Sequence, residues 1–128
     1  MKKLLALIAT TFVAIAAQAG EFPDISIAEV KTAIASKKAT IIDVNGSDSW
    51  KQGHVPSAID FVAAKADLAK ALPADKSSLV IAYCGGPSCG AYAAAAKAAK
   101  ELGYTNVKHM SAGISGWMQA GEKTEAAK

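Results

Sequence analysis

The sequence predicts an α/β domain with a central parallel sheet and helices on both of its faces. Two short runs, the β-branched 40–44 and the apolar 79–83, have the length and composition of buried strands. Segments with helical spacing alternate with these runs, and such alternation is typical of parallel sheets. The length of 128 residues suits one domain.

Each element has its own local signal. A first helix is expected over 26–36, because Ser26-Ile27-Ala28-Glu29 has the spacing of a capping box. The remaining elements follow in this order: a strand at 40–44 leading into Asn45-Gly46, a helical turn at 47–52, a weak strand at 58–62, a helix at 63–72 stopped by Pro73, a strand at 79–83, a glycine-rich turn at 84–90, an alanine-rich helix ending near 102, a strand at 106–110 and a helix at 114–120.

The first 19 residues have the parts of a secretory signal peptide. Met1-Lys2-Lys3 is basic, residues 4–17 are apolar except for two threonines, and Ala17-Gln18-Ala19 fits the small-x-small pattern before a cleavage site. The apolar run is shorter than the roughly 20 residues that a membrane-spanning helix needs, so no stable membrane insertion is expected after cleavage. An uncleaved N-terminal anchor is the alternative. We therefore expect a periplasmic or secreted protein.

The charge pattern argues against nucleic-acid partners and against tight binding of oxyanions. All 14 basic residues are lysines, and the net charge is +3. These lysines form no basic stripe with interleaved aromatic residues, so nucleic-acid binding is not expected. The missing arginine removes the planar group that binds sulfate, phosphate or carboxylate through two hydrogen bonds.

The segment Tyr83-Cys84-Gly85-Gly86-Pro87-Ser88-Cys89-Gly90 carries the candidate chemistry. It runs from the carboxyl end of a predicted strand to the N-terminus of a predicted helix, where open α/β sheets bind ligands. The N–H groups of a glycine-rich loop and of a helix N-terminus favour an anion. They would stabilise the thiolate of Cys84, which is the nucleophilic form of cysteine.

Three interpretations of the cysteine pair are open at this point. Cys84 and Cys89 are either catalytic or redox-active thiols, or an inert disulfide that closes a very short loop, or part of a metal site. An oxidising compartment permits the disulfide. The metal interpretation is weak, because only His54 and His109 are available to complete a ligand set.

Three separated motifs of this chain resemble the rhodanese domain family. They are Ile41-Ile42-Asp43-Val44 with Trp50 and the segment Gly53 to Ile59; the strand, Cys84 loop and helix; and Leu102-Gly103-Tyr104 with Asn106-Val107, Ala112-Gly113-Ile114 and Trp117. The resemblance spans about residues 24–121. It implies a single rhodanese-like three-layer domain at 20–121, after a signal peptide at 1–19 and before a flexible tail at 122–128.

The resemblance also implies a sulfurtransferase or sulfane-sulfur carrier that forms a persulfide on Cys84. The loop would bind the outer sulfur through its N–H groups, and its residues are Gly85, Gly86, Pro87, Ser88 and Gly90. Asp43 and His54 match family positions that we interpret as organising the loop rather than reacting. No cofactor or metal is implied. The expected partners are a small sulfur donor, thiosulfate or a persulfide, and a thiol acceptor or reductant, and we expect a monomer.

The chain departs from the family pattern where many members carry arginine. The second and sixth loop positions are Gly85 and Cys89, the run after the first strand ends in Asn45, and Ser49 replaces a usual acidic residue. Binding of thiosulfate should therefore be weaker. Cys89 either resolves a Cys84 persulfide by forming a disulfide or only fills the space of the missing arginine.

Two function classes compete with sulfur transfer. A periplasmic thiol–disulfide redox protein would use the same Cys84/Cys89 pair. A noncatalytic binding module would need neither cysteine, and the intact-looking Cys84 loop argues against it.

Cleavage of the signal peptide gives a first prediction. N-terminal sequencing of the exported protein should begin at Gly20, because Ala17-Gln18-Ala19 follows an apolar run too short to span a membrane. Recovery of the protein in the membrane fraction with Met1 intact would contradict the prediction.

Overall fold

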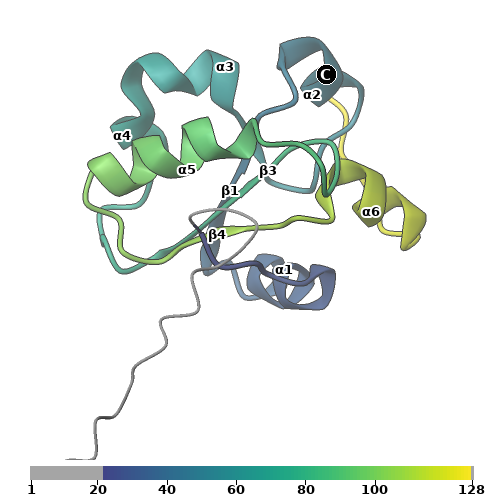
Figure 1. The fold of residues 1–128 in the computed structure, drawn as a ribbon, viewed down its shortest axis with the longest axis horizontal. Coiled ribbons are helices and arrows are strands. Elements are labelled where there is room, and N and C mark those ends of the chain that lie inside the picture. The colour runs from purple at the N-terminus through teal and green to yellow at the C-terminus, as the bar shows by residue number, and fades with distance from the viewer. Residues whose placement is uncertain (1–21, 128) are drawn as a thin grey trace, which may run out of the picture.

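The computed structural model describes residues 22–127, so the predicted signal peptide at 1–19 lies outside the described residues. A four-stranded sheet has the order β2-β1-β3-β4, and all of its strand pairs are parallel (Figure 1). The strands are β1 (Ala39–Asp43), β2 (Ile59–Asp60), β3 (Leu79–Tyr83) and β4 (Val107–His109). This architecture confirms the predicted α/β class.

Helices cover both faces of the sheet (Figure 1). One side carries α3 (Phe61–Ala64), a short 3-10 turn η1 (Lys65–Asp67), α4 (Leu68–Ala71) and α5 (Tyr92–Glu101); the other carries α1 (Ile27–Ala35) and α6 (Gly113–Gln119), and α2 (Ser47–Gln52) follows β1. Two separate apolar clusters fill the space between these helices and the sheet. The three-layer arrangement therefore places a buried face on each side of β3.

The first and longest helices have clear sequence causes. The Ser26 hydroxyl accepts a hydrogen bond from the Glu29 N–H at 3.1 Å, so the predicted capping box starts α1. In α5, Ala95, Ala96 and Ala99 are fully buried against the sheet. Methyl side chains let this helix lie close to β3, and alanine also favours the helical backbone.

The second strand is shorter than the sequence indicates. The expected strand at 58–62 is reduced to Ile59–Asp60, because the Asp60 carboxylate accepts the Val62 N–H at 3.0 Å and starts α3. The expected helix at 63–72 is likewise divided into α3, η1 and α4. Local capping overrides the weak strand pattern here.

The segment after α6 has specific contacts over its described part, where the sequence predicts a flexible tail at 122–128. The N–H and carbonyl groups of Glu125 pair with those of His54, both at 2.9 Å. The Trp117 indole donates to the Lys123 carbonyl at 2.8 Å, and the Ala127 N–H donates to the Lys51 carbonyl at 3.0 Å. These bonds tie the segment to α6 and to the end of α2, and local composition does not reveal such long-range contacts.

Among residues 22–127, no helix combines the length and apolar character that crossing a membrane requires.

Candidate active site

Cys84 follows β3 directly, and its side chain is 1% exposed. Alternate residues of a strand face opposite sides of a sheet. Cys84 therefore shares one apolar cluster with Ala82 and with Tyr92 at the start of α5, whereas Tyr83 belongs to the cluster on the other face. The structure places the sulfur between the carboxyl end of β3 and the beginning of α5.

Cys84 and Cys89 are joined by a disulfide, with their Cα atoms 6.3 Å apart. Cys84 Sγ lies 3.4 Å from the carbonyl oxygen of Cys89, and the Cys89 N–H donates to the Gly86 carbonyl at 3.1 Å. This turn brings the sixth loop residue back over the first. The bridge therefore joins the first and sixth residues of the loop, and only an external thiolate can open it by exchange.

Several backbone N–H groups of the cysteine loop, residues 84–90, have no hydrogen-bond acceptor. Among the described residues, the N–H groups of Gly85, Gly86, Ser88 and Gly90 donate no hydrogen bond. Pro87 has no N–H, and the Cys89 N–H is used in the turn. Unpaired N–H groups beside a helix N-terminus provide a positive environment for a thiolate or another small anion.

The first turn of α6 holds the base of the cysteine loop. The Ile114 N–H donates to the Cys84 carbonyl at 2.9 Å, and the Ser115 N–H donates to the Gly85 carbonyl at 3.0 Å. Gly113 lies so close to the loop that a Cβ there would be 2.6 Å from backbone atoms of Gly85 and Gly86. In the sequence Gly113 stands out only as part of a family motif, which does not indicate this contact.

Asp43 forms a buried network on the opposite face of the sheet from Cys84. Its carboxylate accepts hydrogen bonds from the Tyr83 hydroxyl and, at 2.8 Å, from the Asn45 N–H. The Tyr83 oxygen in turn accepts the Val55 N–H at 3.0 Å. Burial raises the pKa of Asp43, and the two hydrogen bonds oppose that rise. Burial and the bond to Asp43 raise the pKa of Tyr83 far above its usual value, so the phenol is a neutral donor.

The network joins two loops of the site. Asn45 follows β1, and its side-chain oxygen lies 3.9 Å from the position that a Cβ on Gly85 would take. Asp43 thus fixes a segment that lies next to the cysteine loop. Sequence reasoning did not find the role of Tyr83, whose signal was a hydroxyl on a strand that is otherwise apolar.

His54 is buried in a turn away from the cysteine pair. Its ring stacks on the Trp50 ring with centroids 4.2 Å apart, and its Nδ1 lies 2.7 Å from the Trp50 carbonyl oxygen. It also contacts Glu125, both through the backbone pairing and through its Nε2, which lies 3.9 Å from the Glu125 carboxylate. These contacts fix the end of α2, and none of them reaches Cys84.

The second histidine lies at the carboxyl end of β4. His109 is 5% exposed and stacks on the Tyr92 ring with centroids 3.4 Å apart. Burial lowers the pKa of His109, and the Asp24 carboxylate opposes this change. Across residues 22–127 no group of three or more His, Cys, Asp or Glu side chains is placed to hold a metal ion.

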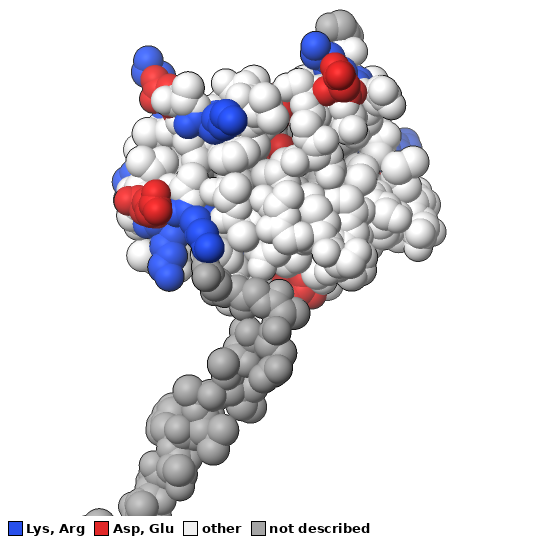
Figure 2. Space-filling view, turned by 45° about the horizontal axis from the view of Figure 1, so that its top comes forward, with Lys and Arg blue, Asp and Glu red and all other residues white. Residues whose placement is uncertain are grey.

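The cysteine loop carries no charged side chain from Cys84 to Ala91. In Figure 2 the lysines and acidic residues of the visible face lie mostly towards its margins, around a broad uncharged area. The loop itself therefore offers an anion at Cys84 backbone N–H groups and no cationic side chain.

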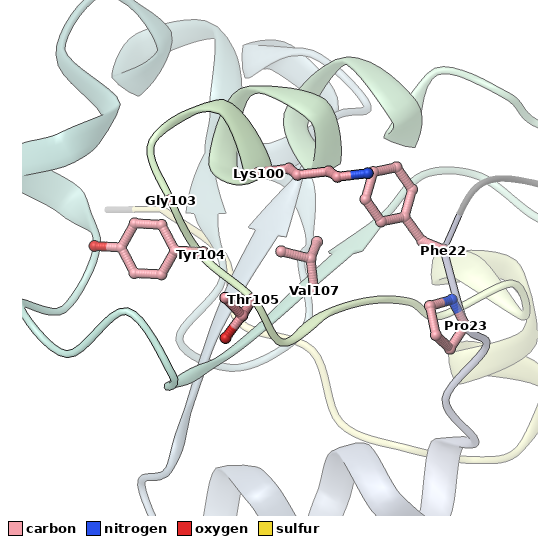
Figure 3. Close-up of a pocket in the computed structure, with 7 residues that line it drawn as sticks. All are labelled: Phe22, Pro23, Lys100, Gly103, Tyr104, Thr105 and Val107. Carbon is pink, nitrogen blue, oxygen red and sulfur yellow. The ribbon is translucent and has the colours of Figure 1, made fainter.

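A pocket of about 490 Å³ lies elsewhere, beside the start of β4 and the end of α5 (Figure 3). Lys100 extends there towards the Phe22 ring, with 5.9 Å between its ammonium nitrogen and the ring centroid. The other lining residues are Pro23, Gly103, Tyr104, Thr105 and Val107. This pocket contains no cysteine and shares no residue with the loop at 84–90.

Residues 26–120 match the family described as the rhodanese-like domain. The chain therefore belongs to the rhodanese-like domain family, as the sequence motifs indicated.

One curated protein is similar to this chain in sequence, and solved structures are similar to it in fold. The HTH-type transcriptional regulator Rv0324 of Mycobacterium tuberculosis is 32% identical over 85 residues, which are 66% of this chain and 36% of that protein. The chain thus spans just over a third of this curated relative's length. Two solved structures are similar in fold. Thiosulfate sulfurtransferase from Pseudomonas aeruginosa has a TM-score of 0.61 and 23% identity, over 84% of this chain and 21% of that chain. The human single-domain sulfurtransferase TSTD1 has a TM-score of 0.59 and 22% identity, over 76% of this chain and 96% of that chain.

The contact between Gly113 and the loop gives a prediction about stability. Gly113→Ala should lower the free energy of unfolding by about 2–4 kcal/mol, because it adds a backbone clash to a left-handed residue with φ +64°. Gly121→Ala is the matched control, since φ is +77° there and nothing lies within 4 Å of the added Cβ. That control should lose only about 1–2 kcal/mol. Equal losses in urea unfolding of the two variants would contradict the importance of the contact.

Proposed function

We propose that this protein is an exported sulfurtransferase in which Cys84 takes up sulfane sulfur as a persulfide. The carrying observation is the position of Cys84 beneath a loop with unpaired N–H groups and beside the start of α5. Membership of the rhodanese-like domain family supports the proposal, as does the similar fold of the P. aeruginosa thiosulfate sulfurtransferase. The predicted signal peptide supports export.

Sulfur uptake begins from the open dithiol. The Cys84 thiolate attacks the outer sulfur of thiosulfate, a new S–S bond forms, the bond between the outer sulfur and the sulfonate sulfur breaks, and sulfite leaves. The unpaired N–H groups stabilise the negative charge of the thiolate before attack and of the persulfide afterwards. A small-molecule persulfide can replace thiosulfate, and a thiolate then leaves instead of sulfite.

Sulfur release has two routes. An external thiolate attacks the outer sulfur and carries it away, which regenerates the Cys84 thiolate. Alternatively the Cys89 thiolate attacks Cys84 Sγ, the Cys84–Cys89 bond forms and hydrosulfide leaves. The second route ends in the disulfide that the structure contains, so each cycle then needs a thiol reductant that supplies two electrons.

The disulfide itself favours one alternative function. A thiol–disulfide redox protein would exchange this bridge with thiols of other molecules and would never carry a persulfide. The two functions differ in one measurable product, because only sulfur transfer adds the mass of one sulfur atom to Cys84.

The roles of the two cysteines should separate in single variants. Cys84→Ser should abolish persulfide formation and sulfur transfer, because a hydroxyl is far less nucleophilic and cannot hold sulfane sulfur. Cys89→Ser should still accept sulfur from thiosulfate, because the unpaired loop N–H groups remain. Its persulfide should live longer than that of the reduced parent protein if Cys89 is the resolving thiol. Mass spectrometry of the intact protein measures both results. Sulfur transfer that survives Cys84→Ser and disappears in Cys89→Ser would reverse the assignment.

The uncharged loop should limit the use of oxyanion donors. Gly85→Arg places a guanidinium at the second loop position and keeps both cysteines. A Cβ there meets only the Asn45 side-chain oxygen, at 3.9 Å. In the reduced protein this variant should lower KM for thiosulfate several-fold with little change in kcat, because a fixed cation adds ground-state binding. Gly85→Gln, which adds a long uncharged side chain, is the control. Equal KM values for the two variants would indicate that charge does not limit donor binding.

A further inference from the structure

We propose that Cys89 is the sulfur that external thiols attack, and that the disulfide closes the site to sulfur donors until this attack has released Cys84. This inference rests on the proposed function of Cys84 and assigns the order in which the site is opened and loaded. Thiol attack, bridge opening and sulfur loading are then consecutive steps.

The two sulfurs differ in access. Cys84 is 1% exposed and lies in the apolar cluster under α5, so no nucleophile of molecular size reaches it in the bridged form. Cys89 is partly exposed, and the residues on both sides of it, Ser88 and Gly90, are exposed. Which sulfur a thiolate attacks depends on access, and here access favours Cys89.

The two cysteines also differ in how firmly their backbones are held. Cys84 continues from the central strand β3, and α6 binds its carbonyl through the Ile114 N–H at 2.9 Å. The N–H of Cys89 makes only a bond within the same loop, to the Gly86 carbonyl at 3.1 Å. Of the two backbones, that of Cys89 has fewer contacts with the elements around the loop.

Attack on Cys89 also expels the more favourable leaving group, which is the Cys84 thiolate. When a thiolate attacks Cys89, the bond between the two cysteine sulfurs breaks and Cys84 leaves as a thiolate. The unpaired N–H groups of Gly85 and Gly86 belong to the two residues that follow it, and they would offset the cost of a thiolate in the apolar cluster. Attack on Cys84 would instead expel the Cys89 thiolate towards the exposed side of the loop.

The disulfide is opened in two steps, and each step is balanced in atoms and electrons. An external thiolate forms a mixed disulfide with Cys89 and Cys84 becomes a thiolate. A second thiolate then attacks the external sulfur of the mixed disulfide, an external disulfide leaves, and Cys89 becomes a thiolate. The external thiols are oxidised by two electrons in total and the protein is reduced by two. A dithiol reductant supplies both thiolates, and the uncharged loop places no charged side chain against it.

The test maps the first mixed disulfide. Oxidised protein is mixed with 2-mercaptoethanol, and after short intervals excess N-ethylmaleimide blocks the released thiol irreversibly. Both cysteines lie in the tryptic peptide 77–97, so fragmentation between them assigns each label. We expect mercaptoethanol on Cys89 and maleimide on Cys84 in at least about tenfold excess over the reverse pattern, since access decides which sulfur reacts. Mercaptoethanol mainly on Cys84, equal labelling of both positions, or a bridge that resists the thiol altogether would each overturn the inference.

A second arm separates this inference from the proposed function. Thiosulfate without reductant should leave the oxidised protein unchanged, whereas reduced protein and Cys89→Ser, which cannot form the bridge, should each gain one sulfur. Uptake of sulfur by the fully oxidised parent protein would contradict the proposal that the disulfide closes the site to sulfur donors. If neither the reduced protein nor Cys89→Ser gains sulfur while mercaptoethanol still labels Cys89, the proposed sulfur transfer fails and the order of thiol attack stands.

Discussion

The backbone contact between α6 and the cysteine loop is the constraint on which the rest of the site depends. Gly113 brings two chain segments so close that no side chain fits between them, and the next two N–H groups bind the carbonyls of Cys84 and Gly85. Because α6 occupies these carbonyls, the loop is held by its acceptors while most of its donors are left unpaired. The same contact thus provides both the rigidity of the loop and its affinity for negative charge.

The side chains of β3 alternate between the two faces of the sheet, and this alternation separates two chemical environments that would interfere with each other. Cys84 faces the α5 side, whereas Tyr83 faces the other side and binds the Asp43 carboxylate. A carboxylate next to the sulfur would disfavour its ionisation. With the sheet between them, Asp43 organises the loop after β1 through Asn45, and its hydrogen bonds are directed away from the sulfur.

Much of this fold could be predicted from the sequence, because its signals are local. The capping box at Ser26, the apolar run of β3 and the glycines of the cysteine loop each act within a few residues of themselves. The contacts that sequence reasoning missed join distant segments. Examples are Gly113 against the loop, the Tyr83 hydroxyl on Asp43, and the pairing of Glu125 with His54, which tertiary packing decides. The cysteine pair could be located from sequence, but the difference in burial between its two sulfurs could not.

The alanine-rich helix α5 limits how sequences of this type can diverge. Ala95, Ala96 and Ala99 set the distance between helix and sheet by their methyl groups, so the helix cannot shift along β3 to absorb an added or deleted residue in the preceding turn. A residue added to or deleted from that turn would require α5 to repack against β3, whereas the exchange of a side chain within the turn would leave this packing intact.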